Sequence, residues 1–163
     1  MAIEYDLDCA TRLPSIALAE RLADAGKKTG VFDAAASGQA LVNLRVGVLT
    51  RLGTWVCVTA SGPLHPQHTI VAGLGFTPTV GVGFRLAKGV EVSAQQDDMI
   101  RLVAPLLEEV DGDAVLHCQL EEIWLLRRDG ELSLSGDDDL WRFQRLALVA
   151  PPYRRESLSM VPD

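Results

Sequence analysis

The fold class of this chain is decided by the stretch Ala114-Val-Leu-His-Cys-Gln-Leu-Glu-Glu-Ile-Trp-Leu-Leu-Arg-Arg-Asp-Gly-Glu-Leu-Ser-Leu134. Apolar residues recur there at every second position, which is typical of strands with one buried face. Asp129-Gly130 is a dipeptide favoured in two-residue hairpin turns. We therefore expect a long antiparallel hairpin over residues 114–135. Its inward face would carry Leu116, Cys118, Leu120, Trp124, Leu126, Leu132 and Leu134.

Glu122 interrupts this alternation, because it falls on the apolar side of the hairpin. A β-bulge that re-aims the side chain would explain the exception. A carboxylate drawn into the interior is the other explanation, and its pKa would then rise. For a buried Glu122, we favour an ion pair with an arginine such as Arg85 or Arg101 over a functional carboxyl group with a raised pKa.

Earlier parts of the chain add strands and two helices. A helix is predicted from Pro14 to Ala25, with Gly26 just past its end. A second helix is predicted to begin with a capping box, Ser93 and Gln96, and to be kinked or shortened by Pro105. The expected class is α+β, a mainly antiparallel sheet with two helices packed on one face. The expected order is β-α-β-β-β-α-β-β, with one domain over residues 1–150 and a tail over residues 151–163.

Composition limits the function. The 163 residues are 48% hydrophobic, enough for a real core in one domain, and the net charge is −7. Acidity is regional, since residues 88–140 hold 14 acidic and 4 basic side chains. We therefore expect no nucleic-acid binding, which relies on basic residues. The chain shows no secretory signal pattern and no run of about 18 apolar residues, so we expect a cytoplasmic protein that does not span a membrane.

Residues that carry chemistry are present, but their spacing favours structural roles. His65 and His68 share a loop, yet their spacing matches no zinc signature. His117 and Cys118 are neighbours on a strand, so their side chains point to opposite faces. Asp137-Asp138-Asp139 lacks the spaced ligands of a calcium loop. We predict no catalytic residue, no cofactor and no metal ligand.

Blocks spread over residues 1–155 share a pattern with a known family. They are Met1-Ala-Ile-Glu-Tyr-Asp-Leu7, Arg51-Leu-Gly-Thr-Trp-Val56, Gly75-Phe-Thr-Pro-Thr-Val80, Gly83-Phe-Arg-Leu86, Gln95-Gln-Asp-Asp-Met-Ile-Arg-Leu-Val103, Gly112-Asp-Ala-Val-Leu-His117, Ile123-Trp-Leu-Leu-Arg-Arg128, Gly130-Glu-Leu-Ser-Leu134 and Asp139-Leu-Trp141. Together they resemble bacterial immunity proteins of the swarming-inhibition (Sit) type, third group. The resemblance implies a cytoplasmic protein that binds and neutralises a cognate toxin, with no catalytic motif to transfer.

Our first hypothesis is an immunity-type binding protein that neutralises its toxin by a direct, charge-assisted complex. An acidic surface would suit a basic toxin. The residues expected to bind this partner are Asp97, Asp98, Glu121, Asp137, Asp138, Asp139 and, as an aromatic anchor, Trp141. Two alternatives remain open. One is a small metal-dependent hydrolase that uses Glu122, His117 and the aspartate cluster, and the other is a ligand- or protein-binding adaptor unrelated to toxins.

Overall fold

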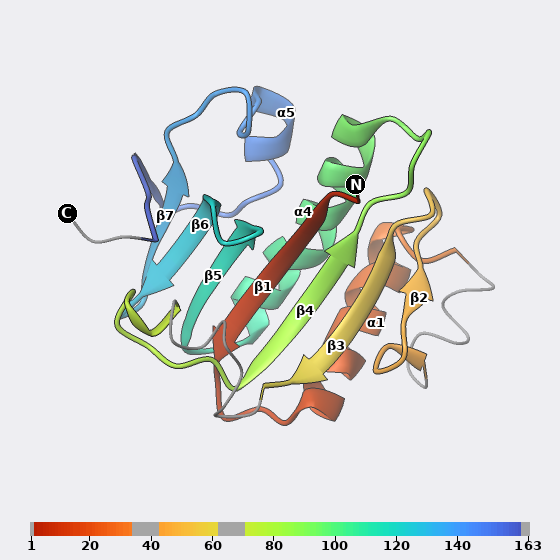
Figure 1. Ribbon diagram of the computed structural model, residues 1–163, viewed down its shortest axis with the longest axis horizontal. Helices are drawn as coiled ribbons and strands as arrows, with labels where there is room; N and C mark the ends of the chain where they lie inside the picture. Colours follow the sequence, from red (N-terminus) through yellow and green to blue (C-terminus); the bar gives the residue numbers. More distant parts are fainter. Residues whose placement is uncertain (1, 34–42, 62–70, 161–163) are drawn as a thin grey trace.

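A single eight-stranded sheet organises the computed structural model, which describes residues 2–33, 43–61 and 71–160 (Figure 1). Its strand order is β2-β3-β4-β1-β5-β6-β7-β8, and neighbouring strands are antiparallel except for the parallel pair β7–β8. The strands are β1 (Glu4–Ala10), β2 (Val48–Leu49), β3 (Trp55–Ala60), β4 (Val80–Arg85), β5 (Asp113–Cys118), β6 (Glu122–Arg128), β7 (Glu131–Ser135) and β8 (Arg154–Glu156).

Two long helices cover one face of this sheet. Helix α1 (Ser15–Thr29) and helix α4 (Val92–Glu109) lie behind the strands in Figure 1, and they contact each other. A short helix, α5 (Phe143–Leu146), sits at the upper end of the sheet in the same view. The predicted α+β class and the mainly antiparallel sheet are thus confirmed, and the element order is close to the predicted one.

The main core lies between the sheet and the two long helices. Alternation along β1 sends Tyr5, Leu7 and Cys9 toward the helices, where all three are buried. Helix α4 contributes Met99 and Val103 to this core, and the two residues lie one turn apart on its buried side. A second, smaller cluster is separate from this core; it contains Val71, Leu74, Phe76, Val115, Ile123, Leu126 and Met160.

The region predicted as one hairpin is in fact two hairpins, and their junction was missed. Gln119 and Leu120 both have positive φ, and the Glu121 N–H donates to the Cys118 carbonyl at 3.0 Å. Two such residues form a tight turn without glycine, so the usual sequence signal is absent. The register of β5 against β6 then shifts after Leu116. This β-bulge changes which side chains of β6 face the main core, and Leu126 joins the smaller cluster instead.

Both predicted helix boundaries need correction. Helix α1 continues through Gly26 to Thr29, and Gly30 ends it in the left-handed conformation. Helix α4 is capped by Glu91, whose carboxylate accepts from the backbone N–H groups of Ser93 and Ala94. The expected capping box does not form. Pro105 lies within the helix, which nonetheless continues to Glu109.

Part of the expected tail belongs to the sheet. Residues 154–156 form β8, which pairs with β7 so that Leu134 lies opposite Arg155. The Gly136 N–H also donates to the Glu156 carbonyl at 2.9 Å. A strand of three residues that pairs in parallel has too little alternation to be found from the sequence. Its pairing brings the end of the described chain beside the loop that follows β7.

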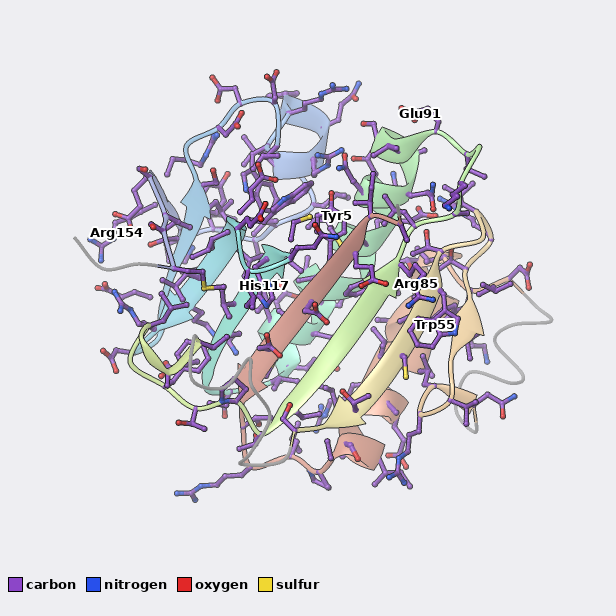
Figure 2. The ribbon with its side chains drawn as sticks, in the orientation of Figure 1. Tyr5, Trp55, Arg85, Glu91, His117 and Arg154 are labelled. Atoms are coloured by element: carbon purple, nitrogen blue, oxygen red, sulfur yellow. The ribbon has the colours of Figure 1, made fainter. Side chains whose placement is uncertain are left out.

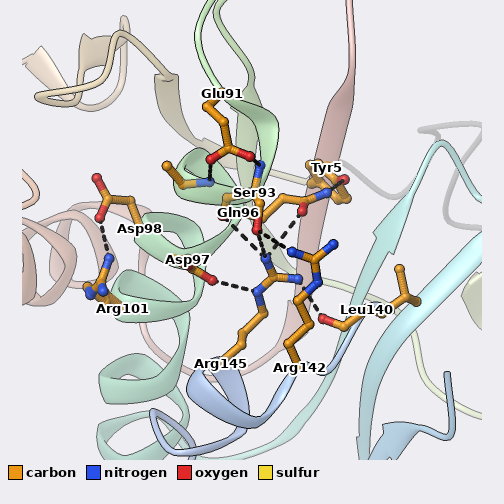
Figure 3. A network of polar contacts seen from close by, with 11 residues as sticks. Tyr5, Glu91, Ser93, Gln96, Asp97, Asp98, Arg101, Leu140, Arg142 and Arg145 are labelled. Carbon is orange, nitrogen blue, oxygen red and sulfur yellow. Dashed lines mark hydrogen bonds and ion pairs between the residues drawn. The ribbon is translucent and has the colours of Figure 1, made fainter. Parts of the chain in front are cut away.

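Arg145 joins α5 to α4 through a buried guanidinium (Figure 3). Its Nε donates to Asp97 Oδ1 at 2.8 Å, and Nη1 donates to the Leu140 carbonyl at 2.6 Å. Nη2 lies 3.1 Å from Ser93 Oγ and 3.3 Å from Gln96 Oε1. The same guanidinium covers the ring of Trp124 at 5.2 Å. These contacts fix α5 against the first two turns of α4 and against the sheet.

We predict that Gly26→Ala destabilises the protein, although alanine is normally better than glycine in a helix. A Cβ at position 26 would lie 2.0 Å from Cδ2 of the buried Phe32 ring. The expected cost is about 1–3 kcal/mol of unfolding free energy, measured by urea denaturation. In a Phe32→Ala background the same change should stabilise by about 0.5–1 kcal/mol. A stabilising effect in the wild-type background would contradict this packing.

We also predict that Arg145→Met lowers the unfolding free energy by about 3 kcal/mol. The change removes the cation that pairs with Asp97 and leaves the Leu140 carbonyl without its donor. Thermal and urea unfolding would measure the loss. Arg142→Met is the matched control, because Arg142 is exposed and has one long contact of 3.5 Å to Ser93. Equal losses for the two variants would show that Arg145 has no special role.

Candidate functional site

Asp98, one of the seven residues expected to bind a partner, is buried and already paired. It is 1% exposed. Its Oδ1 lies 2.7 Å from Arg51 Nη2 and 2.7 Å from Arg101 Nη1, while Oδ2 accepts from Arg51 Nε at 3.0 Å. A carboxylate held by two guanidinium groups is not available to a partner. The expectation for Asp98 was therefore wrong, because α4 turns this side chain toward β2 and its following loop.

Asp97 and Trp141 also have internal roles. Asp97 is partly exposed, but it pairs with the buried Arg145. Trp141 is 1% exposed, its Nε1–H donates to the Trp124 carbonyl at 2.8 Å, and the two indole rings meet edge to face at 5.9 Å. An aromatic ring buried in this way cannot anchor a partner. The expectation that Trp141 anchors a partner is therefore corrected. The residues around it in the sequence are polar and gave no indication that it would be buried.

The remaining four residues come together at one end of the sheet. Glu121 and Asp137 line a cavity of about 460 Å³, and Asp138 and Asp139 follow in the same exposed loop. We call this cavity the acidic groove. Apolar side chains of Ile123, Leu140 and Leu158 alternate around it with polar residues, and its full lining is Glu121, Glu122, Ile123, Ser135, Gly136, Asp137, Leu140, Ser157 and Leu158.

Local turns hold the loop of the acidic groove in place. The Asp139 N–H donates to Asp137 Oδ1 at 2.9 Å, an Asx turn, and the Asp137 N–H donates to Ser135 Oγ at 3.2 Å. Arg155 on β8 donates from Nε to the Ser135 carbonyl at 2.8 Å and from Nη2 to Asp138 at 3.1 Å. The loop is thus tied to two strands, while Asp138 and Asp139 stay exposed.

Glu122 is the member of the acidic groove that sequence reasoning misplaced. We favoured a buried carboxylate paired with Arg85 or Arg101, but Glu122 is exposed and accepts from Trp124 Nε1 at 3.1 Å. Arg85 pairs with Glu4, and Arg101 pairs with Asp98. The bulge that we considered as the other explanation is present at Leu116 and His117. It shifts the register of β6, so Glu122 need not enter the core.

Of the groups proposed for a hydrolase, Glu122 and Asp137 of the aspartate cluster meet in the acidic groove, but His117 does not join them. His117, labelled in Figure 2, is fully buried, and its Nε2 lies 2.7 Å from Asp8 Oδ2. The Leu120 N–H donates to His117 Nδ1 at 3.1 Å, which places the ring proton on Nε2 and directs it at Asp8. Both ring nitrogens are therefore occupied. Glu122, by contrast, lies in the exposed acidic groove with its carboxylate toward Trp124.

Cysteine and metal chemistry find little support in the described residues. Burial raises the pKa of the Cys9 thiol to about 12, and it also raises the pKa values of Cys57 and Cys118. Such thiols are poor nucleophiles near neutral pH. Within residues 2–33, 43–61 and 71–160, no three His, Cys, Asp or Glu side chains are grouped so that they could hold a metal ion. His65 and His68 lie outside the described residues.

Another cavity, of about 710 Å³, lies elsewhere, between the end of β1, α1 and the end of α4. Its lining carries both charges, from Arg12, Arg21, Glu109 and Asp111. Arg21 Nη1 lies 3.7 Å from Glu109 Oε2. None of the predicted partner-binding residues lines this cavity, and its mixed charge gives no preference for a cation or an anion.

Comparison with known proteins identifies a family for the chain. The sequence pattern of the SitI3-like family matches residues 3–145, which include both long helices, strands β1 to β7 and all seven residues expected to bind a partner. No curated protein and no solved structure matches. Among the described helices, none has the length and apolar character needed to cross a bilayer. The extent of the match shows that the chain belongs to the SitI3-like family.

Proposed function

We propose that this chain binds and neutralises a cognate bacterial toxin by forming a direct, charge-assisted complex in the cytoplasm. Membership of the SitI3-like family supports an immunity-type role. The observation that carries the finer proposal is the convergence of Glu121, Glu122 and Asp137 in one cavity, with Asp138 and Asp139 beside it. Carboxylates concentrated in this way attract and orient a basic partner surface.

The proposed interface is thus the acidic groove with its aspartate loop. Asp97, Asp98 and Trp141 are excluded from it because their side chains are used inside the protein. A basic toxin segment would place lysine or arginine side chains against the groove and apolar groups against Ile123, Leu140 and Leu158. Occlusion of the toxin, rather than chemistry on it, is the proposed mechanism of neutralisation.

Co-expression with the protein encoded beside the gene tests this function. Growth is scored for cells that make the neighbouring protein alone and for cells that make both proteins. The proposal expects the neighbour to be toxic and this chain to restore growth through a complex that copurifies. Toxicity without rescue, or rescue without a complex, would rule out neutralisation of that protein by binding.

For the acidic groove we predict that Glu121→Lys with Asp139→Lys weakens the complex at least about tenfold, or about 1.4 kcal/mol. Both side chains are exposed, and within the part of the chain that the structure describes neither accepts a hydrogen bond nor forms an ion pair. The loss should be largest at low NaCl, and the affinity of the variant should respond less to added salt. Titration calorimetry at low and high NaCl, with an inactivated toxin, measures both effects.

The matched control is Glu20→Lys with Glu108→Lys. These residues are exposed on α1 and α4, and the pair changes the net charge by the same amount. Its affinity should stay within about threefold of wild type, because distant charges act weakly through solvent. Equal losses in the two double variants would mean that net charge matters and the acidic groove does not. An unchanged affinity of the groove variant would reject this interface.

A further inference from the structure

Phe143 is an aromatic side chain that the fold leaves in water. It is 87% exposed, more than any other large hydrophobic residue in the described parts of the chain. Exposed single apolar residues are common, so exposure alone has little meaning. Phe143 differs because it begins α5 only four residues after the aspartates of the acidic groove loop. Its position relates it directly to the proposed interface.

The segment that carries Phe143 is held firmly, although the ring itself is solvent-exposed. Two residues further on, the buried Arg145 contacts Asp97, Ser93 and the Leu140 carbonyl. Two residues before Phe143, the buried Trp141 donates to the Trp124 carbonyl. The exposed Phe143 is therefore held between two fixed anchors. A rigid aromatic group loses little conformational entropy when a partner covers it, which favours binding.

Charge around α5 defines the partner that would fit. The helix is preceded by Asp137, Asp138 and Asp139. The exposed Glu91, which caps α4, lies near α5 as well, because Ser93 two residues later contacts Arg142 and Arg145. Arg142, directly before α5, is an exposed cation, and Arg155 is offset by Asp138. Val92, also exposed, adds a second apolar side chain at the α4 end of this surface. This surface therefore has the aromatic ring of Phe143 at its centre and mostly acidic residues around it.

We propose that Phe143 is the apolar anchor of the partner interface, and that it takes a basic protein segment whose lysine or arginine side chains flank an apolar contact or stack on the ring. The acidic surround supplies the charge complementarity, and a cation over an aromatic face adds to it. This inference rests on the proposed toxin binding and deepens it. It transfers to Phe143 the anchoring role that the sequence assigned to Trp141.

The test compares Phe143→Ala with Ile16→Ala in binding to the inactivated neighbouring protein. Ile16 is a matched control, because it is a large apolar residue on α1 and is 56% exposed. Phe143→Ala should weaken binding at least about tenfold, and Ile16→Ala should stay within about threefold. Phe143→Trp should retain affinity, since an aromatic ring is kept. Unfolding temperatures of all three variants should match wild type, because both residues lie on the surface.

The outcomes separate the inference from the function. If wild type binds and Phe143→Ala binds equally well, the anchor is refuted while toxin binding stands. If Trp55→Ala weakens binding and Phe143→Ala does not, docking occurs on the open sheet face, where Trp55 stacks with Arg85 at 5.5 Å (Figure 2). That result also refutes the anchor. Failure of the wild-type chain to bind overturns the proposed function and the inference with it.

Discussion

A single buried cation, the guanidinium of Arg145, determines the arrangement of the end of the molecule where the candidate interface lies. Moving such a charge out of water is costly unless it is fully paired. Here Asp97, Ser93, Gln96 and the Leu140 carbonyl surround it, and Trp124 covers its face. Because these partners come from α4, the β7–α5 loop and β6, one side chain fixes all three relative to one another.

The same region shows why regional charge and surface charge are different quantities. Residues 88–140 are strongly acidic, yet several of their carboxylates are used within the fold. Asp98 neutralises two arginines, Asp97 pairs with Arg145, and Glu91 caps α4. Of the carboxylates that remain, Glu121, Asp137, Asp138 and Asp139 lie at or beside the acidic groove, whereas Glu108 and Glu131 are exposed elsewhere. The proposed interface therefore rests on the clustering of these four carboxylates.

Arg127 illustrates how far basic side chains also serve the fold. Its guanidinium donates to the carbonyls of Leu107, Val110 and Gly112, at and just beyond the end of α4. These are the groups that a helix leaves without backbone partners at its C-terminus. The pairing stabilises the connection from α4 to β5. Arg127, Arg145 and Arg51 are thus bound to internal partners, and Arg155 is the arginine that pairs with the loop of the acidic groove, at Asp138.

Period-two and helical patterns were sufficient to predict the α+β class, β1, β4 and the two long helices, since burial of one face imposes those periods. Features without a period were missed. The turn at Gln119 and Leu120 has no glycine, the bulge after Leu116 depends on the pairing of β5 with β6, and β8 has three residues. Gly26 lies inside α1 and not at its end, because the Phe32 ring occupies the space that a Cβ would need, which is a tertiary constraint.

The fold class, the family resemblance and the acidic segment could be predicted from the residues alone, because composition, alternation and blocks of residues are local properties. Which carboxylates remain available to a partner depends on the packing of distant parts of the chain. Asp98 and Glu122 look alike in the sequence, yet one lies between two arginines and the other lies in an exposed groove. Trp141 and Phe143 are likewise close in the sequence, yet Trp141 is buried and Phe143 is exposed, because burial depends on residues far away in the chain.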